Sequence, residues 1–141
     1  MPKLLVPVDD SKLSLRVIER LLAQLGWYRE PPDIHLLNVR HPLHGEVGLF
    51  VGQAQISEFH REQGLKALAA ARQRLDEAGV SYQFHIGVGD PAEVITRYAR
   101  EQGCDQIVMG TGGHGPVTAL LLGSVASKVL RLAEVPVLLI K

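Results

Sequence analysis

The sequence predicts an α/β fold in three layers, with an open parallel five-stranded sheet between helices on both faces. Three observations predict it. Five short apolar runs recur along the 141 residues, amphipathic stretches of helical period separate them, and the two kinds of segment alternate strictly as βαβαβαβαβ. Runs that are apolar throughout are typical of strands covered on both faces, and strict alternation implies right-handed crossovers and hence a parallel sheet.

The five predicted strands cover residues 4–8, 34–39, 82–88, 106–109 and 137–140. The last of them closes the chain and takes an edge position in the predicted sheet, where unpaired backbone groups invite pairing with another molecule. We therefore expect a homodimer formed through the segment from Val135 to Ile140. The opposing interpretation is an edge covered by its own chain, since Pro136 discourages strand addition.

The four predicted helices have start and stop signals. The first follows Ser11 as N-cap and ends at Gly26, and the second spans residues 53–78 and ends at Gly79. Its inner face is expected to carry Ile56, Phe59, Leu65, Leu68, Ala69 and Leu75. The third begins at Pro91 and stops at Gly103. The fourth follows Ser124, which we expect to be its cap, and ends before Pro136.

Composition limits the classes of partner. Lysine and arginine number 15 and so do aspartate and glutamate, so no net field favours nucleic acid. Apolar runs are far shorter than the roughly 20 residues of a membrane span. The single cysteine, Cys104, cannot form an internal disulfide, and the first residues lack the pattern of a secretory signal. We expect no membrane insertion, a cytoplasmic location, and a buried, inert Cys104.

The most informative segment is MGTGGHGPVTALLLGS, residues 109–124, which lies between a predicted strand and a predicted helix. Its five glycines, Gly110, Gly112, Gly113, Gly115 and Gly123, let backbone N–H groups converge on an anion. The pair Gly123 and Ser124 adds free amides of a helix N-terminus and a hydroxyl. Two half-sites on one segment predict a polyphosphate ligand.

Two other phosphate-binding motifs fit this segment poorly. A P-loop needs a lysine, and none occurs between Asp90 and Lys128. The spacing GxGxxG is present at Gly110, Gly112 and Gly115, but it should open a helix in a first βαβ unit, whereas Pro116 and one last strand follow here. What remains is Gly110, two residues, Gly113, nine residues, and Gly123 with Ser124.

That spacing, together with the start VPVDDS, the turn VGDP at residues 88–91 and the ending VPVLLIK, resembles the universal stress protein family in its ATP-binding branch. The resemblance covers essentially the whole chain. It implies one domain over residues 1–141 with a Rossmann-like, adenine nucleotide alpha hydrolase-like fold and strand order 3-2-1-4-5.

The resemblance also implies a set of site residues. In ATP-binding members the aspartate after the first strand lies near ribose and phosphate, the end of the second strand contacts adenine, and the glycine segment holds phosphates. By position these are Asp9, Val39, Met109, Gly110, Gly113, Gly123 and Ser124. The lining of the predicted mouth extends the set to Pro7, Val8, His114, Gly115 and Val125.

This chain departs from the family pattern by having Gly112 and Gly115 where histidine and a basic residue are common. Phosphate neutralisation would then depend on backbone amides, the helix N-terminus and a Mg²⁺ ion carried with ATP, since Lys128 lies one turn into the helix. We expect neither catalytic residues nor protein metal ligands. His41 and His44 are expected to be solvated, and His114 to face either an anion or water.

The sequence therefore predicts an ATP-binding module of a stress or energy response, with little or no hydrolysis and an unidentified regulatory protein partner. Two alternatives stay open. One is a dimeric interaction protein of the same fold that binds no nucleotide, and the other is a slow Mg²⁺-dependent ATPase. Asp9, Asp10 and Ser11 also have a purely structural interpretation, as caps of the first helix.

Overall fold

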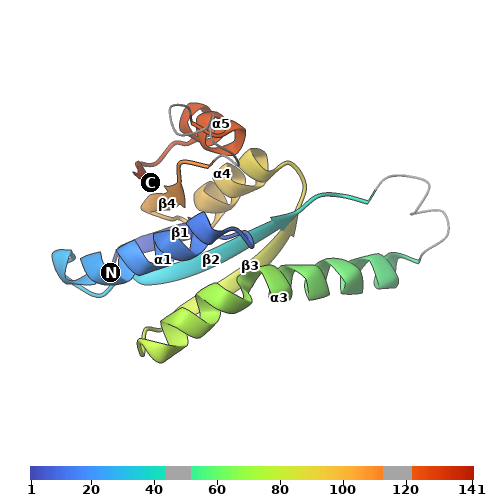
Figure 1. The fold of residues 1–141 in the computed structure, drawn as a ribbon. Coiled ribbons are helices and arrows are strands. Elements are labelled where there is room, and N and C mark those ends of the chain that lie inside the picture. Colours follow the sequence, from blue (N-terminus) through green and yellow to red (C-terminus); the bar gives the residue numbers. More distant parts are fainter. Residues whose placement is uncertain (44–51, 113–121) are drawn as a thin grey trace.

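A computed structural model describes residues 1–43, 52–112 and 122–141 of the chain (Figure 1). In chain order the elements are β1 (Lys3–Pro7), α1 (Lys12–Gln24), the 3₁₀ turn η1 (Leu25–Trp27), β2 (Asp33–Arg40), α3 (Gln53–Glu77), β3 (Tyr82–Val88), α4 (Pro91–Glu101), β4 (Gln106–Gly110), α5 (Ser124–Leu132) and β5 (Val137–Ile140). All the predicted strands and helices are confirmed, with bounds that differ by one or two residues.

The five strands form one sheet in the order β3-β2-β1-β4-β5, with every neighbouring pair parallel. Helices α1 and α3 cover one face, and α4 and α5 cover the other. The predicted three-layer α/β fold and its strand order are therefore confirmed. From β1 the chain adds β2 and β3 toward one edge of the sheet, and it then crosses to the other side of β1 to add β4 and β5. Strand order therefore reverses between β1 and β4.

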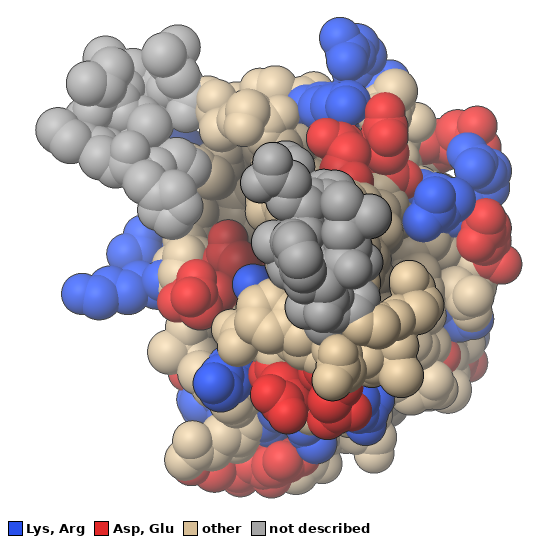
Figure 2. Space-filling view, turned by 90° about the vertical axis from the view of Figure 1, so that its right-hand side faces the viewer, with Lys and Arg blue, Asp and Glu red and all other residues tan. Residues whose placement is uncertain are grey.

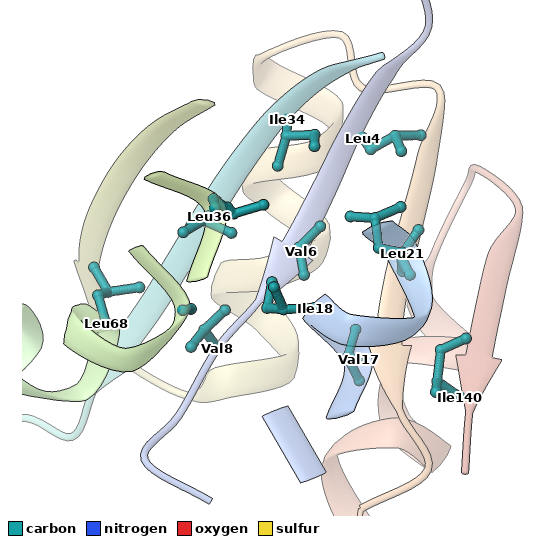
Figure 3. Packing of buried hydrophobic residues seen from close by; sticks show 13 residues of the cluster. Leu4, Val6, Val8, Val17, Ile18, Leu21, Ile34, Leu36, Leu68 and Ile140 are labelled. Carbon is teal, nitrogen blue, oxygen red and sulfur yellow. The ribbon is translucent and has the colours of Figure 1, made fainter. Parts of the chain in front are cut away.

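Alternate residues of the central strands feed two separate cores. On β1, Leu4 and Val6 pack with α1 and α3, whereas Leu5 between them packs with α4 and α5. Figure 3 shows the first cluster, in which Val17, Ile18 and Leu21 of α1 lie over the strands. Because these side chains are almost fully buried, their removal from water is the main driving force that holds the layers together.

Most helix boundaries follow the predicted signals. The Ser11 hydroxyl accepts a hydrogen bond from the Ser14 N–H at 3.2 Å and caps α1. Gly79 and Gly103 take positive φ values of 69° and 65° beyond the ends of α3 and α4. The prediction that Ser124 caps α5 is wrong. Gly123 is the N-cap and Ser124 is the first helical residue.

The inner face of α3 also differs from the prediction. Leu68 and Leu75 are buried as expected, but Phe59 is 44% exposed and Ala69 faces solvent. The buried positions are His60, Gly64, Ala67, Leu68, Ala71 and Leu75. The cause is Gly64, where a Cβ atom would lie only 2.7 Å from the Ile86 side chain. Helix α3 therefore approaches β3 most closely at a glycine, a position that a hydrophobic pattern does not mark as buried.

The two edge strands are less buried than their apolar sequences suggested. On β3, Gln83 and Val88 are exposed, and on β5 only Ile140 is fully buried. An edge strand has a neighbour on one side only, so its side chains lie at the rim of each helical layer. Within the residues that the structure describes, no helix is long and apolar enough to cross a membrane.

Candidate functional site

The predicted mouth lies where β1, β2 and β4 end, because these three strands are neighbours in the sheet and point the same way. The strand order reverses between β1 and β4, and ligands of open α/β sheets occupy the crevice at such a point. Figure 2 views this edge of the sheet. Acidic and basic side chains are interspersed on it, in keeping with the zero net charge.

The end of β1 is fixed by backbone pairing with β2. The N–H of Val8 donates to the Leu37 carbonyl at 2.8 Å, and the buried side chain of Asn38 donates to the Val8 carbonyl at 2.8 Å. These bonds hold Pro7 and Val8 at the mouth. The prediction from sequence missed Asn38, although an amide within an otherwise apolar strand is a signal that it bonds to a neighbouring backbone.

Asp9 belongs to a closed hydrogen-bond ring at the start of α1. Its Oδ1 accepts from the Ser11 N–H and from the Ser14 hydroxyl, both at 2.8 Å, while its own N–H donates to the Ser14 oxygen at 2.9 Å. The structural role proposed for this aspartate is therefore real. Its side chain is nevertheless exposed, and the ring fixes the position of the carboxylate at this edge of the sheet.

The end of β4 and the start of α5 are joined by a backbone clamp. The Thr111 N–H donates to the Ile140 carbonyl at 2.9 Å, and the Thr111 carbonyl accepts from the Gly123 N–H at 2.8 Å. Gly112 has a φ of +75°, and a Cβ there would lie 3.3 Å from the Gly123 Cα. The clamp holds Thr111, the residue that follows β4, against Gly123, the N-cap of α5.

Gly110 also has a packing role. A Cβ atom on it would lie 2.7 Å from the Cγ and Cδ2 atoms of Leu13 on α1, so a larger residue would displace that helix. Gly110 is thus needed for the fold itself, and its presence alone does not demonstrate a phosphate site. Gly113, His114 and Gly115 lie outside the described residues.

Within the described residues, the first turn of α5 receives no side-chain capping bond from its N-cap. Gly123 as N-cap contributes no side chain, Ser124 is exposed, and Val125 is half-buried against the α4 side of the core. The N–H groups of a first helical turn have no intrahelical partner and carry the positive end of the helix dipole. The backbone N–H groups and the Ser124 hydroxyl at this end of α5 can therefore donate hydrogen bonds to an anion.

Lys128, the basic residue nearest to that turn in sequence, is engaged elsewhere. Its Nζ lies 3.0 Å from Asp90 Oδ2 and 3.5 Å from Glu93 Oε1 at the start of α4. The Asp90 carboxylate raises the pKa of Lys128, while the Glu93 N–H and Lys128 lower the pKa of Asp90. The ammonium group of Lys128 is thus paired with carboxylates at the start of α4.

The remaining predicted residues are found as follows. Val39 is half-buried near the end of β2 and packs on the α4 side of the sheet, and His41 is exposed just beyond it.

Cys104 is buried, and burial raises the pKa of its thiol, as expected for an inert cysteine. His44 falls outside the described part of the chain. No group of three His, Cys, Asp or Glu side chains placed to hold a metal occurs among residues 1–43, 52–112 and 122–141.

Comparisons with known proteins agree with the fold. Universal stress protein MJ0577 of Methanocaldococcus jannaschii is 32% identical over 152 residues, covering 99% of this chain and 94% of that protein. Its solved structure matches with a TM-score of 0.81 at 26% identity, over 99% of this chain and 95% of the other. Universal stress protein MJ0531 of the same organism is 31% identical over 153 residues, 99% of this chain and 81% of that protein.

Some solved relatives contain nucleotides. A universal stress protein family protein of Arabidopsis thaliana with AMP bound matches with a TM-score of 0.72 at 23% identity, over all of this chain and 92% of that one. Others of this fold are complexes with cAMP and with dAMP. The sequence pattern of the Universal stress protein family matches residues 1–141, the whole length of the given sequence. This chain belongs to the universal stress protein family.

Proposed function

We propose that this protein binds an adenine nucleotide, ATP accompanied by Mg²⁺, at the edge of the sheet where β1, β2 and β4 end. One observation carries the proposal. The turn at Asp9 and the clamp between Thr111 and Gly123 follow β1 and β4, between which strand order reverses, and Val39 lies near the end of the neighbouring β2. The relatives solved with AMP, cAMP and dAMP support an adenylate as the ligand.

Each segment has a distinct part in this proposal. The half-buried Val39 offers backbone groups and an apolar surface to adenine, and Asp9 offers a carboxylate to a ribose hydroxyl. Gly110, the first turn of α5 and the Ser124 hydroxyl would hold phosphate oxygens. With Lys128 paired to Asp90, magnesium would supply the cationic charge that the phosphates need.

We propose a binding module, not an efficient ATPase. Rapid phosphoryl transfer needs a positioned base and cations on the transferred group. Residues 109–124 contain neither a carboxylate nor a lysine nor an arginine. The bound nucleotide would instead order this edge of the molecule and so present an altered surface to a regulatory protein in a stress or energy response.

Calorimetric titration tests the proposal. The purified protein is titrated with ATP in the presence and absence of Mg²⁺ and with NAD as a comparison ligand, and any ligand released on denaturation is identified by mass spectrometry. We expect saturable ATP binding that Mg²⁺ strengthens, and weaker binding of NAD. Absence of ATP binding at millimolar Mg²⁺-ATP would instead favour the interaction protein without nucleotide. Phosphate release that requires Mg²⁺ would establish the slow ATPase.

We also propose a homodimer through β5. The N–H groups of Ile107 on β4 and of Thr111 just after it donate hydrogen bonds to the carbonyls of Pro136 and Ile140. Because backbone groups of a strand alternate in direction, the N–H and C=O groups of Val137 and Leu139 point away from β4. These outward groups and the half-buried apolar side chains of this edge are suited to pairing with a second copy.

A further inference from the structure

Three hydrogen-bonded side chains connect β2 to β3 on the side of the sheet that α4 covers. The Nδ1 of His35 lies 3.0 Å from the Nε2 of His85, and the Nε2 of His35 lies 3.0 Å from Asp33 Oδ2. Asp33 is the first residue of β2 and pairs with Lys3 at the start of β1. This relay of Asp33, His35 and His85 therefore begins at the end of the sheet opposite to the candidate nucleotide site. The ring of His85 contacts Tyr98 of α4, with centroids 4.8 Å apart.

The two imidazole rings meet edge to edge. Their planes differ by only 4°, and their centroids are 5.3 Å apart. That separation is close to the largest that a nitrogen contact of 3.0 Å permits, so the hydrogen bond runs along a nitrogen lone pair in the plane of both rings. A metal ion does not fit between nitrogens that face each other at this distance, because each bond from zinc to an imidazole nitrogen is about 2.0 Å long.

The relay fixes which nitrogens carry hydrogens. An ionised carboxylate only accepts hydrogen bonds, so the Nε2 of His35 donates to Asp33. The Nδ1 of a neutral His35 is then an acceptor, and the Nε2 of His85 donates to it. In the neutral tautomer of His85 that results, Nδ1 carries a lone pair and no hydrogen. The free end of the relay is therefore a basic, nucleophilic nitrogen.

That nitrogen is open to solvent. His85 is half-buried, and its Nδ1 makes no hydrogen bond within residues 1–43, 52–112 and 122–141. The described polar atoms that lack both a partner and contact with solvent are Asn38 Oδ1, His60 Nδ1 and Arg72 Nε, so His85 Nδ1 retains accessible surface. Burial, and then the proximity of His35, lower the pKa of His85. At neutral pH its lone pair is therefore free to react.

We propose that His85 Nδ1 is a covalent acceptor for an activated phosphoryl group, independent of the proposed nucleotide site. The Nδ1 lone pair forms a bond to phosphorus while the bond from phosphorus to the leaving group breaks, and the leaving group takes that electron pair. The imidazole of His85 then carries a positive charge and keeps its Nε2 proton. Through His35, the Asp33 carboxylate stabilises this charge, as a carboxylate does for the imidazolium of a catalytic triad. The added phosphate charge would lie beside the edge strand β3 and change the surface presented to a partner.

The test uses phosphoramidate as probe, a small phosphoryl donor whose leaving group is ammonia. The protein is incubated with it at pH 7.5, and phosphorylated histidines are identified by ³¹P NMR and by mass spectrometry of peptides kept away from acid. His41, which is exposed and lies outside the relay, is the internal reference. We expect His85 to be phosphorylated faster than His41 although it is less exposed. Saturating Mg²⁺-ATP should leave the rate at His85 unchanged, so this result does not depend on the nucleotide site.

One variant and a matched control test the role of the carboxylate. Asp33→Asn keeps an acceptor oxygen for His35 but removes the negative charge. It should slow phosphorylation of His85 about 10-fold, the effect of losing a hydrogen bond to a charged group, and leave the rate at His41 unchanged. Asp76→Asn, at an exposed position near the end of α3, should change neither rate. An unchanged rate at His85 in Asp33→Asn, or faster phosphorylation of His41 than of His85 in the wild type, would overturn the proposal.

Discussion

The Nδ1 of His35 and the Nε2 of His85 lie 3.0 Å apart and link β2 to β3 across the sheet. On its other side, His35 Nε2 lies 3.0 Å from Asp33 Oδ2, so the three side chains form a chain of hydrogen bonds. His35 is 4% exposed. When the Nε2 of His85 carries a hydrogen, it donates to His35 Nδ1 while His35 Nε2 donates to Asp33, so both ring nitrogens of His35 have partners.

The first prediction is that the protein loses stability as pH falls below about 6.5. Burial, and then the proximity of His35, lower the pKa of His85 from its ordinary value of 6.5. The unfolded chain therefore binds a proton at a higher pH than the folded chain does. Stability is full above pH 6.5 and is lost as pH falls through the window between the unfolded and folded pKa values of His85.

Urea unfolding followed by circular dichroism at pH 7.5, 6.5 and 5.5 measures this effect. The groups that contact His85 are His35, which in turn bonds to Asp33, and Tyr98 on α4, whose ring centroid lies 4.8 Å away. His85→Phe keeps an aromatic ring but cannot titrate. This variant should show a flatter dependence on pH over the same window, and an unchanged slope would assign the effect to another group.

The second prediction concerns Ser124→Ala. Since Gly123 and not Ser124 is the N-cap of α5, removal of the exposed Ser124 hydroxyl should change the free energy of unfolding by less than about 0.5 kcal/mol. If the hydroxyl donates to a phosphate oxygen, ATP affinity should fall about 10- to 100-fold, equivalent to about 1.5–3 kcal/mol. Calorimetry measures the affinity, and Ser127→Ala in the next turn is the control. Unchanged affinity would remove Ser124 from the site.

The third prediction concerns the close approach of α3 to β3. Gly64→Ala should destabilise the protein by about 1–2 kcal/mol, because overpacking against Ile86 outweighs the better helix propensity of alanine. Gly26→Ala is the control, since a Cβ there meets nothing within 4 Å. When Ile86 is already alanine, Gly64→Ala should lower the free energy of unfolding by less than it does in the wild type. Equilibrium unfolding of the wild type, the two single variants and the double variant gives the coupling energy.

The fourth prediction separates the two roles of Asp90. Its carboxylate accepts from the Glu93 N–H at 3.1 Å as the cap of α4 and from Lys128 at 3.0 Å. Asp90→Ala should therefore lower the melting temperature more than Lys128→Ala does. Asp90→Asn keeps a capping oxygen and loses only the charge, so it should behave like Lys128→Ala. If Asp90→Asn and Asp90→Ala were equally harmful, the ion pair and not the cap would dominate.

The fifth prediction concerns assembly. Size-exclusion chromatography with light scattering should give twice the mass of one chain at micromolar concentration. Leu139→Pro removes an N–H that points away from β4, so it should shift the protein toward the monomer while far-ultraviolet circular dichroism stays native. Ile140→Pro, on the side that faces β4, should instead reduce thermal stability. A wild-type monomer at all accessible concentrations would exclude pairing through β5.

The local signals in the sequence were sufficient for most of the fold. Alternation of apolar runs with helical periods predicted the parallel sheet, and Ser11, Gly79, Pro91 and Gly103 marked helix ends correctly. These features depend on backbone geometry within a few residues, which the residue types themselves dictate. The glycine spacing predicted which segments could meet a polyphosphate, a prediction that the titration with ATP tests.

Other features depended on partners distant in the chain. Nothing near Gly64 or Gly110 shows that Ile86 and Leu13 would lie within 3 Å of an added Cβ, and Phe59 looked as suitable for the core as Leu68. The pairing of Lys128 with Asp90, 38 residues apart, and the imidazole link 50 residues apart also came only with the fold. The sequence by itself determined the elements, their order and the candidate site segments, because these follow from local conformational preference and hydrophobic period. Tertiary structure alone decided which glycines are needed for packing and which charges are already paired, because packing and electrostatic contacts act through space between residues that sequence spacing does not relate.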